Sequence, residues 1–205
     1  MEAYITVAIV AYVIGSINFA VIFSRKFAGF DVREKGSKNA GTTNVLRTVG
    51  KKVALLTLVC DILKGVAAIL VAIFAKNMWS GFDVNTLKYI AGFMVILGHT
   101  YPIFFEFRGG KGVATAIGVL LMLDWKIGLI CLVFGLVIIA ITRMVSLGSI
   151  FAAILFPILT IFIHEGGTVI GTVISFLIAA LIVFNHRSNI KRIKEGKENK
   201  LSFKK

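Results

Sequence analysis

The chain has few of the residues that build metal sites and disulfide frameworks. Its 205 residues include two cysteines, three histidines, two prolines and ten acidic residues. Cys60 and Cys131 both fall within apolar segments without metal-ligand spacing, and we expect them to be small buried thiols. We therefore expect no disulfide, no metal and no cofactor. The sequence also has no internal repeat and no low-complexity linker between domains.

A basic signal-peptide start is also missing, because the N-terminal segment to Ser24 is long and apolar. We interpret this segment as a retained membrane span. Hydrophobic residues make up 58% of the chain, and the mean hydropathy is +0.91. These values indicate an integral-membrane protein. We predict one compact helical bundle, and hence a single domain over residues 1–205.

We predict an all-α membrane bundle of seven transmembrane helices, with the N-terminus outside and the C-terminus in the cytoplasm. The fourth and fifth spans are short and could form one helix interrupted at Asp124, so six spans is the alternative. With seven spans, 19 of the 23 Lys and Arg residues fall on one side, as expected for cytoplasmic loops. The spans are expected at about Tyr4–Ser24, Val53–Ala75, Leu87–Phe105, Val113–Leu123, Gly128–Thr142, Leu147–Ile163 and Thr168–Asn185.

The formal net charge of +13 has two explanations within a membrane protein. Either the basic residues only set the topology, or the basic inner loops also bind anionic lipid headgroups. Each basic residue then contributes about 1 kcal/mol of attraction. Membrane lipids are therefore expected partners. We expect no nucleic acid and no obligate protein partner.

The most informative segment is a glycine-rich, basic turn that runs from Gly98 to Thr115 between two apolar segments. Unpaired backbone groups in hydrocarbon cost several kcal/mol each, roughly, so this turn must lie at a membrane surface or line a wet pocket. Glycines allow backbone N–H groups to converge, and Lys111 adds a positive charge, which suits a phosphate. The turn is not a Walker A loop, because glycine follows Lys111. It meets the start of a helix at Val113, whose dipole favours anions.

Two further polar segments are predicted to lie on the same inner side. Residues 36–47 are dense in small hydrogen-bonding side chains and end in Arg47, which can bind a phosphate bidentately. In the tail, His186, Asn189 and Arg192 recur at helical spacing. The alternatives are an ordinary solvated loop for the first segment and a basic amphipathic helix on the bilayer for the second.

Asp61 and Lys64 are charged residues within a predicted span. They are three residues apart and can pair on one helix face. Each charge costs about 2.5–3.5 kcal/mol at a helix centre, so both should face the bundle interior or a wet cavity. A structural ion pair and a substrate contact both remain open for them. For His99, a structural hydrogen-bonded role is the alternative to a role in the site.

These segments resemble the bacterial integral-membrane acyl-phosphate:glycerol-3-phosphate acyltransferases. The matching strings occur in the family's order and span nearly the whole chain: GSIN (15–18), GSKNAGTTNVLR (36–47), DILKG (61–65), GHTYPIFFEFRGGKGVAT (98–115) and HRSNIKRIKEGKE (186–198). The resemblance implies a seven-span enzyme of the bacterial inner (cell) membrane, with its active site facing the cytoplasm. It also implies acyl transfer from acyl phosphate to glycerol 3-phosphate in phospholipid biosynthesis, giving lysophosphatidic acid and inorganic phosphate.

The resemblance also implies which residues form the site. The catalytic candidates are Ser37, Arg47, Lys111, His186 and Asn189, and together with Ser149 they are the implied glycerol-3-phosphate contacts. The acyl-phosphate pocket is expected at Gly109, Gly110 and Gly112, with Thr43 nearby. Further substrate-binding candidates are Asn39, Asn44, Lys64, His99 and Arg192.

The residues present suit direct, single-step acyl transfer. The chain has no convincing nucleophile triad, and it lacks the His-x4-Asp box of acyl-CoA-type acyltransferases. We predict that Arg47 and Lys111 hold the glycerol phosphate, that the glycine N–H groups hold the donor phosphate, and that His186 and Asn189 orient the hydroxyl. An organic-anion transporter and a phospholipid-binding structural protein are the rival interpretations.

Overall fold

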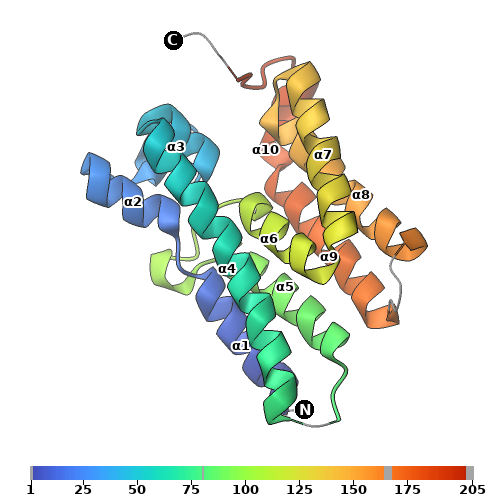
Figure 1. The fold of residues 1–205 in the computed structure, drawn as a ribbon. Helices are drawn as coiled ribbons and strands as arrows, with labels where there is room; N and C mark the ends of the chain where they lie inside the picture. The colour runs from blue at the N-terminus through green and yellow to red at the C-terminus, as the bar shows by residue number, and fades with distance from the viewer. Residues whose placement is uncertain (1, 80, 164–167, 202–205) are drawn as a thin grey trace. The chain divides into compact units, whose positions relative to one another are not determined.

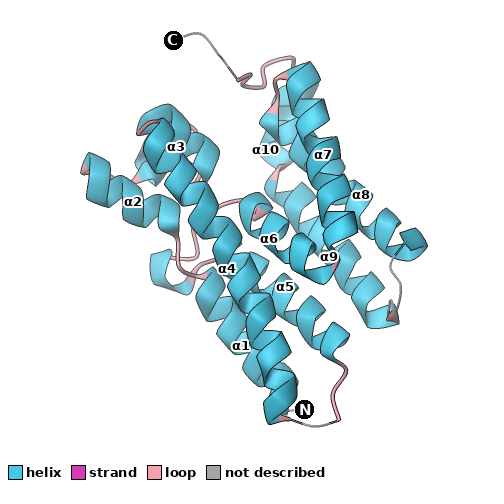
Figure 2. Cartoon of the chain, viewed as in Figure 1, coloured by secondary structure: helices cyan, strands magenta, loops and turns pink. Residues whose placement is uncertain are grey.

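The computed structural model describes residues 2–79, 81–163 and 168–201, which form helices and loops with no strand among them (Figures 1 and 2). The all-α prediction is therefore confirmed. The chain divides into two compact units, unit 1 (Met1–Leu123) and unit 2 (Asp124–Lys205). A single functional domain over the whole chain stays a prediction.

Unit 1 is built around two long helices, α4 and α5, which pack against each other (Figure 1). Helix α1 packs on both of them, and α6 packs mainly on α4. The elements of unit 1 are α1 (Glu2–Gly15), α2 (Phe19–Ala28), η1 (Val32–Glu34), α3 (Thr42–Thr48), α4 (Lys51–Met78), α5 (Val84–Thr100), η2 (Ile103–Phe105) and α6 (Val113–Leu123).

The first predicted span consists of two helices. Helix α1 ends at Gly15, and α2 begins after Asn18, whose side-chain oxygen accepts a hydrogen bond from the N–H of Val21 at 3.1 Å. Helices α1 and α5 approach closely beside this break. A Cβ at Gly98 would lie 3.0 Å from the Ser16 nitrogen, so a glycine is required there.

Within the described residues, five helical segments are long and apolar enough to cross a membrane, and a sixth is counted if α9 and α10 form one bent span. Helix α6 has 11 residues and is therefore about 16 Å long. A bilayer core is about 30 Å thick, so α6 alone crosses about half of it. A count of seven spans, and the side on which each terminus lies, stay predictions.

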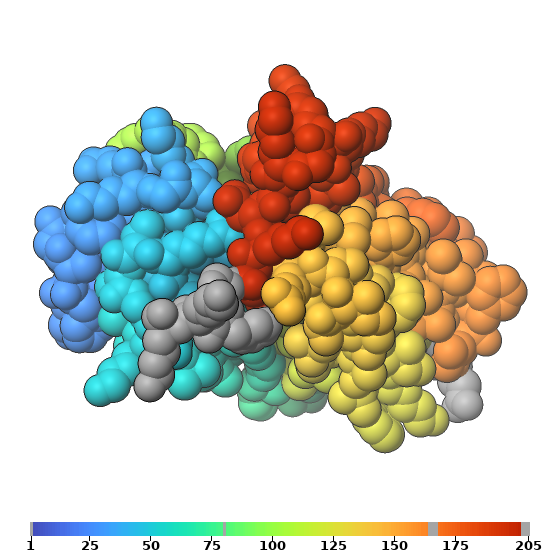
Figure 3. All heavy atoms as spheres, turned by 90° about the horizontal axis from the view of Figure 1, so that it is seen from above, coloured from blue at the N-terminus to red at the C-terminus, as the bar shows by residue number. Residues whose placement is uncertain are grey.

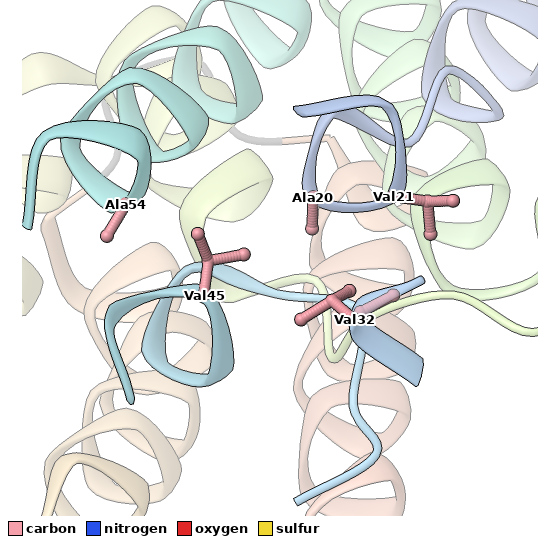
Figure 4. Packing of buried hydrophobic residues seen from close by; sticks show 6 residues of the cluster. Ala20, Val21, Val32, Val45 and Ala54 are labelled. Carbon is pink, nitrogen blue, oxygen red and sulfur yellow. The ribbon is translucent and has the colours of Figure 1, made fainter. Parts of the chain in front are cut away.

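A small hydrophobic cluster anchors the polar end of unit 1. Residues from α2, η1, the loop of residues 36–41, α3 and the start of α4 bury their side chains together (Figure 4). Seen from above, α2 and the segment that follows it form part of the surface of unit 1 at this end (blue in Figure 3). The cluster consists of Ala20, Val21, Val32, Ala40, Val45 and Ala54. It fixes the polar loop onto the membrane helices.

Unit 2 is a helical hairpin, α7 and α8, with α9 packed on α8. Asp124 separates α6 from α7, because its carboxylate caps α7 by accepting hydrogen bonds from the N–H groups of Lys126 at 2.9 Å and Ile127 at 3.2 Å. The two short predicted spans are thus separate helices. The elements of unit 2 are α7 (Trp125–Thr142), α8 (Val145–Ile163), α9 (Val169–Asn185) and α10 (Arg187–Lys194), and α9 and α10 meet at an angle of 57°.

Candidate active site

Asn44 organises the loop of residues 36–47. Its side-chain oxygen accepts a hydrogen bond from the Ser37 N–H at 2.9 Å. Its amide nitrogen donates to the carbonyls of Val32, Lys35 and Asn39 at 2.9–3.0 Å. The side chain is buried, and its amide is engaged by the loop itself, so the structure gives Asn44 a structural role, and its role as a substrate contact stays a prediction.

This loop leaves the predicted phosphate ligands accessible. Ser37 and Arg47 are both exposed, and Arg47 lies in the last turn of α3. Thr43 and Asn39 are half-buried beside them. Gly36 has a positive φ of 60°, and a side chain there would collide with the amide oxygen of Asn44. The turn that presents Ser37 thus requires glycine.

The glycine turn lies directly against this loop and against α5. The N–H of Gly109 donates to the Thr100 carbonyl at 3.0 Å, and the N–H of Gly110 donates to the His99 carbonyl at 3.1 Å. A Cβ at Gly110 would lie 2.7 Å from the Ala40 carbonyl oxygen and would collide with the His99 ring. The end of α5 accepts the hydrogen bonds of both N–H groups here, and phosphate binding by Gly109 and Gly110 stays a prediction.

The first turn of α6 offers other backbone N–H groups. Ala116 makes the first hydrogen bond of the helix, to the Gly112 carbonyl at 2.8 Å. The N–H groups of Val113, Ala114 and Thr115 therefore have no carbonyl acceptor within the helix. These groups and the helix dipole favour an anion just before α6. Gly112, with a φ of 86°, turns the chain into this helix, and the half-buried Lys111 precedes it.

A buried ion pair braces the segment before the glycine turn. The Arg33 guanidinium donates to both carboxylate oxygens of Asp31, and its Nη1 donates to the Phe105 carbonyl at 2.8 Å. Burial alone would raise the pKa of Asp31, but hydrogen bonds from Arg33 and Arg25 outweigh it and lower this pKa to about 2. This pair was not predicted from the sequence. Opposite charges two residues apart, at Asp31 and Arg33, just before a glycine-rich segment could have indicated it.

Asp61, Lys64 and His99 form a second buried charged cluster. The Lys64 ammonium lies 3.0 Å from Asp61 Oδ1, which confirms the predicted pair. It also donates to the carbonyls of Gly15 at 3.1 Å and Ile17 at 2.8 Å, at the end of α1. His99 Nδ1 lies 3.5 Å from the same Asp61 oxygen. Lys64 and His99 were predicted to bind substrate, and both side chains are enclosed within the helices of unit 1.

In unit 2, Glu198 gathers the predicted polar residues. Its Oε1 accepts hydrogen bonds from Ser146 Oγ at 2.8 Å and from Asn189 Nδ2 at 2.7 Å, and its Oε2 accepts one from Arg192 Nε at 2.8 Å. Burial opposes ionisation, but these hydrogen bonds outweigh it and lower the Glu198 pKa. The sequence analysis did not assign Glu198 a role, and only its place in the tail motif pointed to it.

His186 lies buried at the bend between α9 and α10. Its Nδ1 is 2.7 Å from the Ile182 carbonyl oxygen. A carbonyl can only accept, so Nδ1 carries the proton and Nε2 is the acceptor in the neutral ring. Ser149 is also buried, and its hydroxyl donates to the Val145 carbonyl at 2.9 Å.

Each unit therefore assembles its own share of the predicted site. Unit 1 carries Ser37, Asn39, Thr43, Asn44, Arg47, Lys64, His99, Gly109, Gly110, Lys111 and Gly112. Unit 2 carries Ser149, His186, Asn189 and Arg192. Within residues 2–79, 81–163 and 168–201, no group of three or more His, Cys, Asp and Glu side chains could hold a metal ion.

Several known proteins are similar to this chain. The sequence profile of a family described as glycerol-3-phosphate acyltransferase matches residues 5–196. A glycerol-3-phosphate acyltransferase of Clostridioides difficile (strain 630) is 41% identical over 99% of this chain and 98% of its own length. One from Thermoanaerobacter sp. (strain X514) is 43% identical over 100% and 98%, respectively.

Two solved structures are also similar. Both are crystal structures of PlsY (YgiH), described as an integral membrane glycerol 3-phosphate acyltransferase. The glycerol 3-phosphate form has a TM-score of 0.87 and 37% identity, and the match covers 97% of this chain and 96% of that one. The lysophosphatidic acid form has a TM-score of 0.83 and 36% identity, with coverage of 97% and 95%.

Proposed function

The chain belongs to the glycerol-3-phosphate acyltransferase family, and from this premise we propose that it takes the acyl group from an acyl phosphate. The hydroxyl of glycerol 3-phosphate attacks the acyl carbonyl carbon and forms a new ester bond. The bond from that carbon to the phosphate oxygen breaks, so the products are lysophosphatidic acid and inorganic phosphate. The departing phosphate takes the hydroxyl proton.

The observation that carries this proposal is the meeting of two anion-binding elements in unit 1. The loop that exposes Ser37 and Arg47 packs against the glycine turn, where Gly110 lies beneath the Ala40 carbonyl. A reaction between two phosphorylated compounds needs two neighbouring anion sites. Arg47 and Lys111 suit the glycerol phosphate, because a guanidinium and an ammonium bind phosphate by charge-assisted hydrogen bonds. The first N–H groups of α6 suit the phosphate of the donor.

Little further chemistry is required, because phosphate is already a good leaving group. Alignment of the two substrates can lower the barrier by about 7–11 kcal/mol. A hydrogen-bond donor placed at the developing oxyanion adds about 3 kcal/mol. His186, Asn189, Ser149 and Arg192 of unit 2 stay predicted ligands of glycerol 3-phosphate.

The short helix α6 supports a membrane location for the donor. At about 16 Å, α6 is shorter than a full span, so at least one of its ends lies below a membrane surface, and we assign the glycine turn to that end. A donor phosphate held there leaves its acyl chain within the hydrocarbon layer. We place the site on the cytoplasmic side of the bacterial inner membrane, within a seven-span chain whose N-terminus lies outside.

The test uses the purified full-length protein in detergent, with glycerol 3-phosphate and one donor at a time: acyl phosphate, acyl-CoA or acylated carrier protein. We expect lysophosphatidic acid and inorganic phosphate in equal amounts with acyl phosphate alone. Arg47→Ala and Lys111→Ala should each raise the KM for glycerol 3-phosphate about tenfold or more, because each loses a charge-assisted contact of about 1.5–3 kcal/mol.

Two results would reject the proposal. Equal turnover with acyl-CoA would mean that the donor has been wrongly assigned. A covalent acyl-enzyme trapped on a serine or cysteine would replace direct transfer by a two-step mechanism.

A further inference from the structure

Asp61, Lys64 and His99 connect the end of α1 to the glycine turn through the interior of unit 1. All three side chains are at most 4% exposed. Charged side chains are costly within a membrane span and persist there when they have a function. The arrangement of their partners shows which end of the cluster is fixed and which end can act.

Lys64 is the fixed end. Its ammonium has three donors and lies against three acceptors: the Asp61 carboxylate, the Gly15 carbonyl and the Ile17 carbonyl. The two carbonyls lie at and just after the end of α1, where carbonyl groups receive no hydrogen bond from within the helix. Lys64 thus donates hydrogen bonds to both carbonyls at the break between α1 and α2, and it forms an ion pair with Asp61.

Asp61 connects Lys64 to His99. One carboxylate oxygen lies 3.0 Å from Lys64 Nζ and 3.5 Å from His99 Nδ1. At 3.5 Å this is an electrostatic contact and not a hydrogen bond, and it favours the ring orientation that turns Nδ1 toward the carboxylate. With Nδ1 directed at Asp61, Nε2 is the atom nearest to the position of a Cβ on Gly110.

His99 is the end that meets the site. Its ring contacts the glycine turn, and its own carbonyl accepts the N–H of Gly110 at 3.1 Å. The same residue therefore sets both the backbone and the packing of Gly110. The turn leads directly into the first N–H groups of α6, which we assigned to the donor phosphate.

We propose that Asp61, Lys64 and His99 are positioning residues that hold the glycine turn in place for the acyl donor, and that none of them contacts substrate. This inference refines the proposed function and rests on it for the identity of the donor. A displaced turn would carry the start of α6 away from the donor phosphate, while Ser37 and Arg47 would keep their positions on the separate loop. The defect should therefore appear in donor binding before it appears in glycerol-phosphate binding.

The test compares three variants. Asp61→Asn/Lys64→Met removes both charges together. A single substitution would leave an unpaired buried charge and unfold the protein, whereas neutral replacements of a buried ion pair are often tolerated. His99→Phe keeps a ring but loses Nδ1, and His99→Asn keeps a nitrogen near the Nδ1 position. Asp83→Asn removes a carboxylate that caps the opposite end of α5, and it serves as the matched control.

We expect the double variant and His99→Phe to raise the KM for acyl phosphate about tenfold, with the KM for glycerol 3-phosphate changed less than threefold. His99→Asn should recover part of this loss, and Asp83→Asn should match the wild type. Hydrogen exchange provides a readout that does not depend on activity. The Gly109 and Gly110 amides should exchange at least tenfold faster in the double variant and in His99→Phe, while residues 125–163 keep their wild-type rates.

The outcomes separate this inference from the proposed function. Wild-type exchange in the glycine turn of a folded His99→Phe protein would overturn the positioning role. A fall in kcat with both KM values and the exchange rates unchanged would also overturn it, because it would indicate a direct chemical role. Faster exchange in the variants of a protein that shows no acyl-phosphate activity would keep the positioning role and reject the proposed donor.

Discussion

Unit 1 and unit 2 hold their predicted substrate ligands by different means. In unit 1 the loop and the glycine turn are fixed by many backbone contacts, by Asn44 and by two buried charged clusters. In unit 2 Asn189 and Arg192 share one carboxylate, Glu198, in the segment after α10, whereas His186 and Ser149 bond to carbonyls of their own helices. Unit 1 thus distributes the support of its site over many groups, and unit 2 concentrates the support of Asn189 and Arg192 in one side chain.

This difference teaches where each unit is vulnerable. Distributed support fails when the backbone itself is displaced, and concentrated support fails when a single side chain is changed. Five substitutions test this contrast between distributed and concentrated support.

Gly110→Ala should cause the largest loss, at least about a hundredfold in kcat/KM. The added methyl would meet the Ala40 carbonyl and the His99 ring, and a shift of about 1 Å in a positioning element can cost that much. The measurement is initial-rate kinetics on protein that elutes as wild type from a sizing column. Gly29→Asn is the control, because position 29 has open space around it and asparagine tolerates its φ of 72°. A near-normal rate for Gly110→Ala would mean that the turn is not fixed.

Glu198→Gln should lower activity about tenfold to a hundredfold by one substitution in unit 2. It loses charge-assisted hydrogen bonds worth about 1.5–3 kcal/mol, and its amide nitrogen would face donors. Steady-state kinetics and thermal unfolding measure the two consequences. Glu195→Gln is the matched control, because Glu195 only faces Lys197 at 3.9 Å. If the two variants behaved alike, the support in unit 2 would not be concentrated in Glu198.

Arg33→Lys should reduce kcat/KM about tenfold. Lysine keeps the positive charge beside Asp31 but cannot bond its carboxylate and the Phe105 carbonyl at the same time with the same geometry. Arg25 also forms an ion pair with Asp31, but its side chain is exposed. Arg25→Lys should therefore change kcat/KM less than twofold. Equal effects of the two changes on kcat/KM would show that the hydrogen bond from Arg33 to the Phe105 carbonyl does not matter for activity.

Asp31→Asn should change the acid dependence of stability. The folded-state pKa of Asp31 is about 2, below its ordinary value of 3.8, so the carboxylate stabilises the fold above about pH 4. That contribution is lost as the pH falls toward 2. Thermal unfolding in detergent from pH 7 to pH 2 should show the wild type more stable at neutral pH and the gap closing in acid. A gap that stayed constant with pH would contradict the assignment.

Lys76→Ala should have the smallest effect, within about 0.5 kcal/mol in stability and within twofold in activity. Lys76 is exposed at the end of α4, far along that helix from Lys64 and from the polar loop. Kinetics and thermal unfolding check this. A severe loss would challenge the topology in which this end faces outward.

Much of the helical framework was predictable, because long apolar segments leave few alternatives to helices in a membrane. The Asp61–Lys64 pair was also predictable, since spacing alone puts both side chains on one face. The break between α1 and α2 was not, because a polar residue such as Asn18 within an apolar segment fits a continuous helix equally well. Its role as a cap emerges only when Lys64 binds the freed carbonyls.

The glycine turn shows a different limit. Its residue types indicated a phosphate loop, but they could not indicate which N–H groups remain available. That depends on the carbonyls of His99 and Thr100 reaching the turn from the end of α5, which is a tertiary contact. Asn44 is similar, because its amide suits a ligand or a loop equally well until the neighbouring carbonyls are placed.

The cluster around Lys64 also bears on how the chain is made. Asp61, Lys64 and the carbonyls of Gly15 and Ile17 all precede His99 in the chain, so translation produces the ion pair and its acceptors before the histidine. Two opposite charges one helical turn apart can enter the bilayer as a neutral pair, which costs less than either charge alone. The later synthesis of His99 then adds the link to the glycine turn.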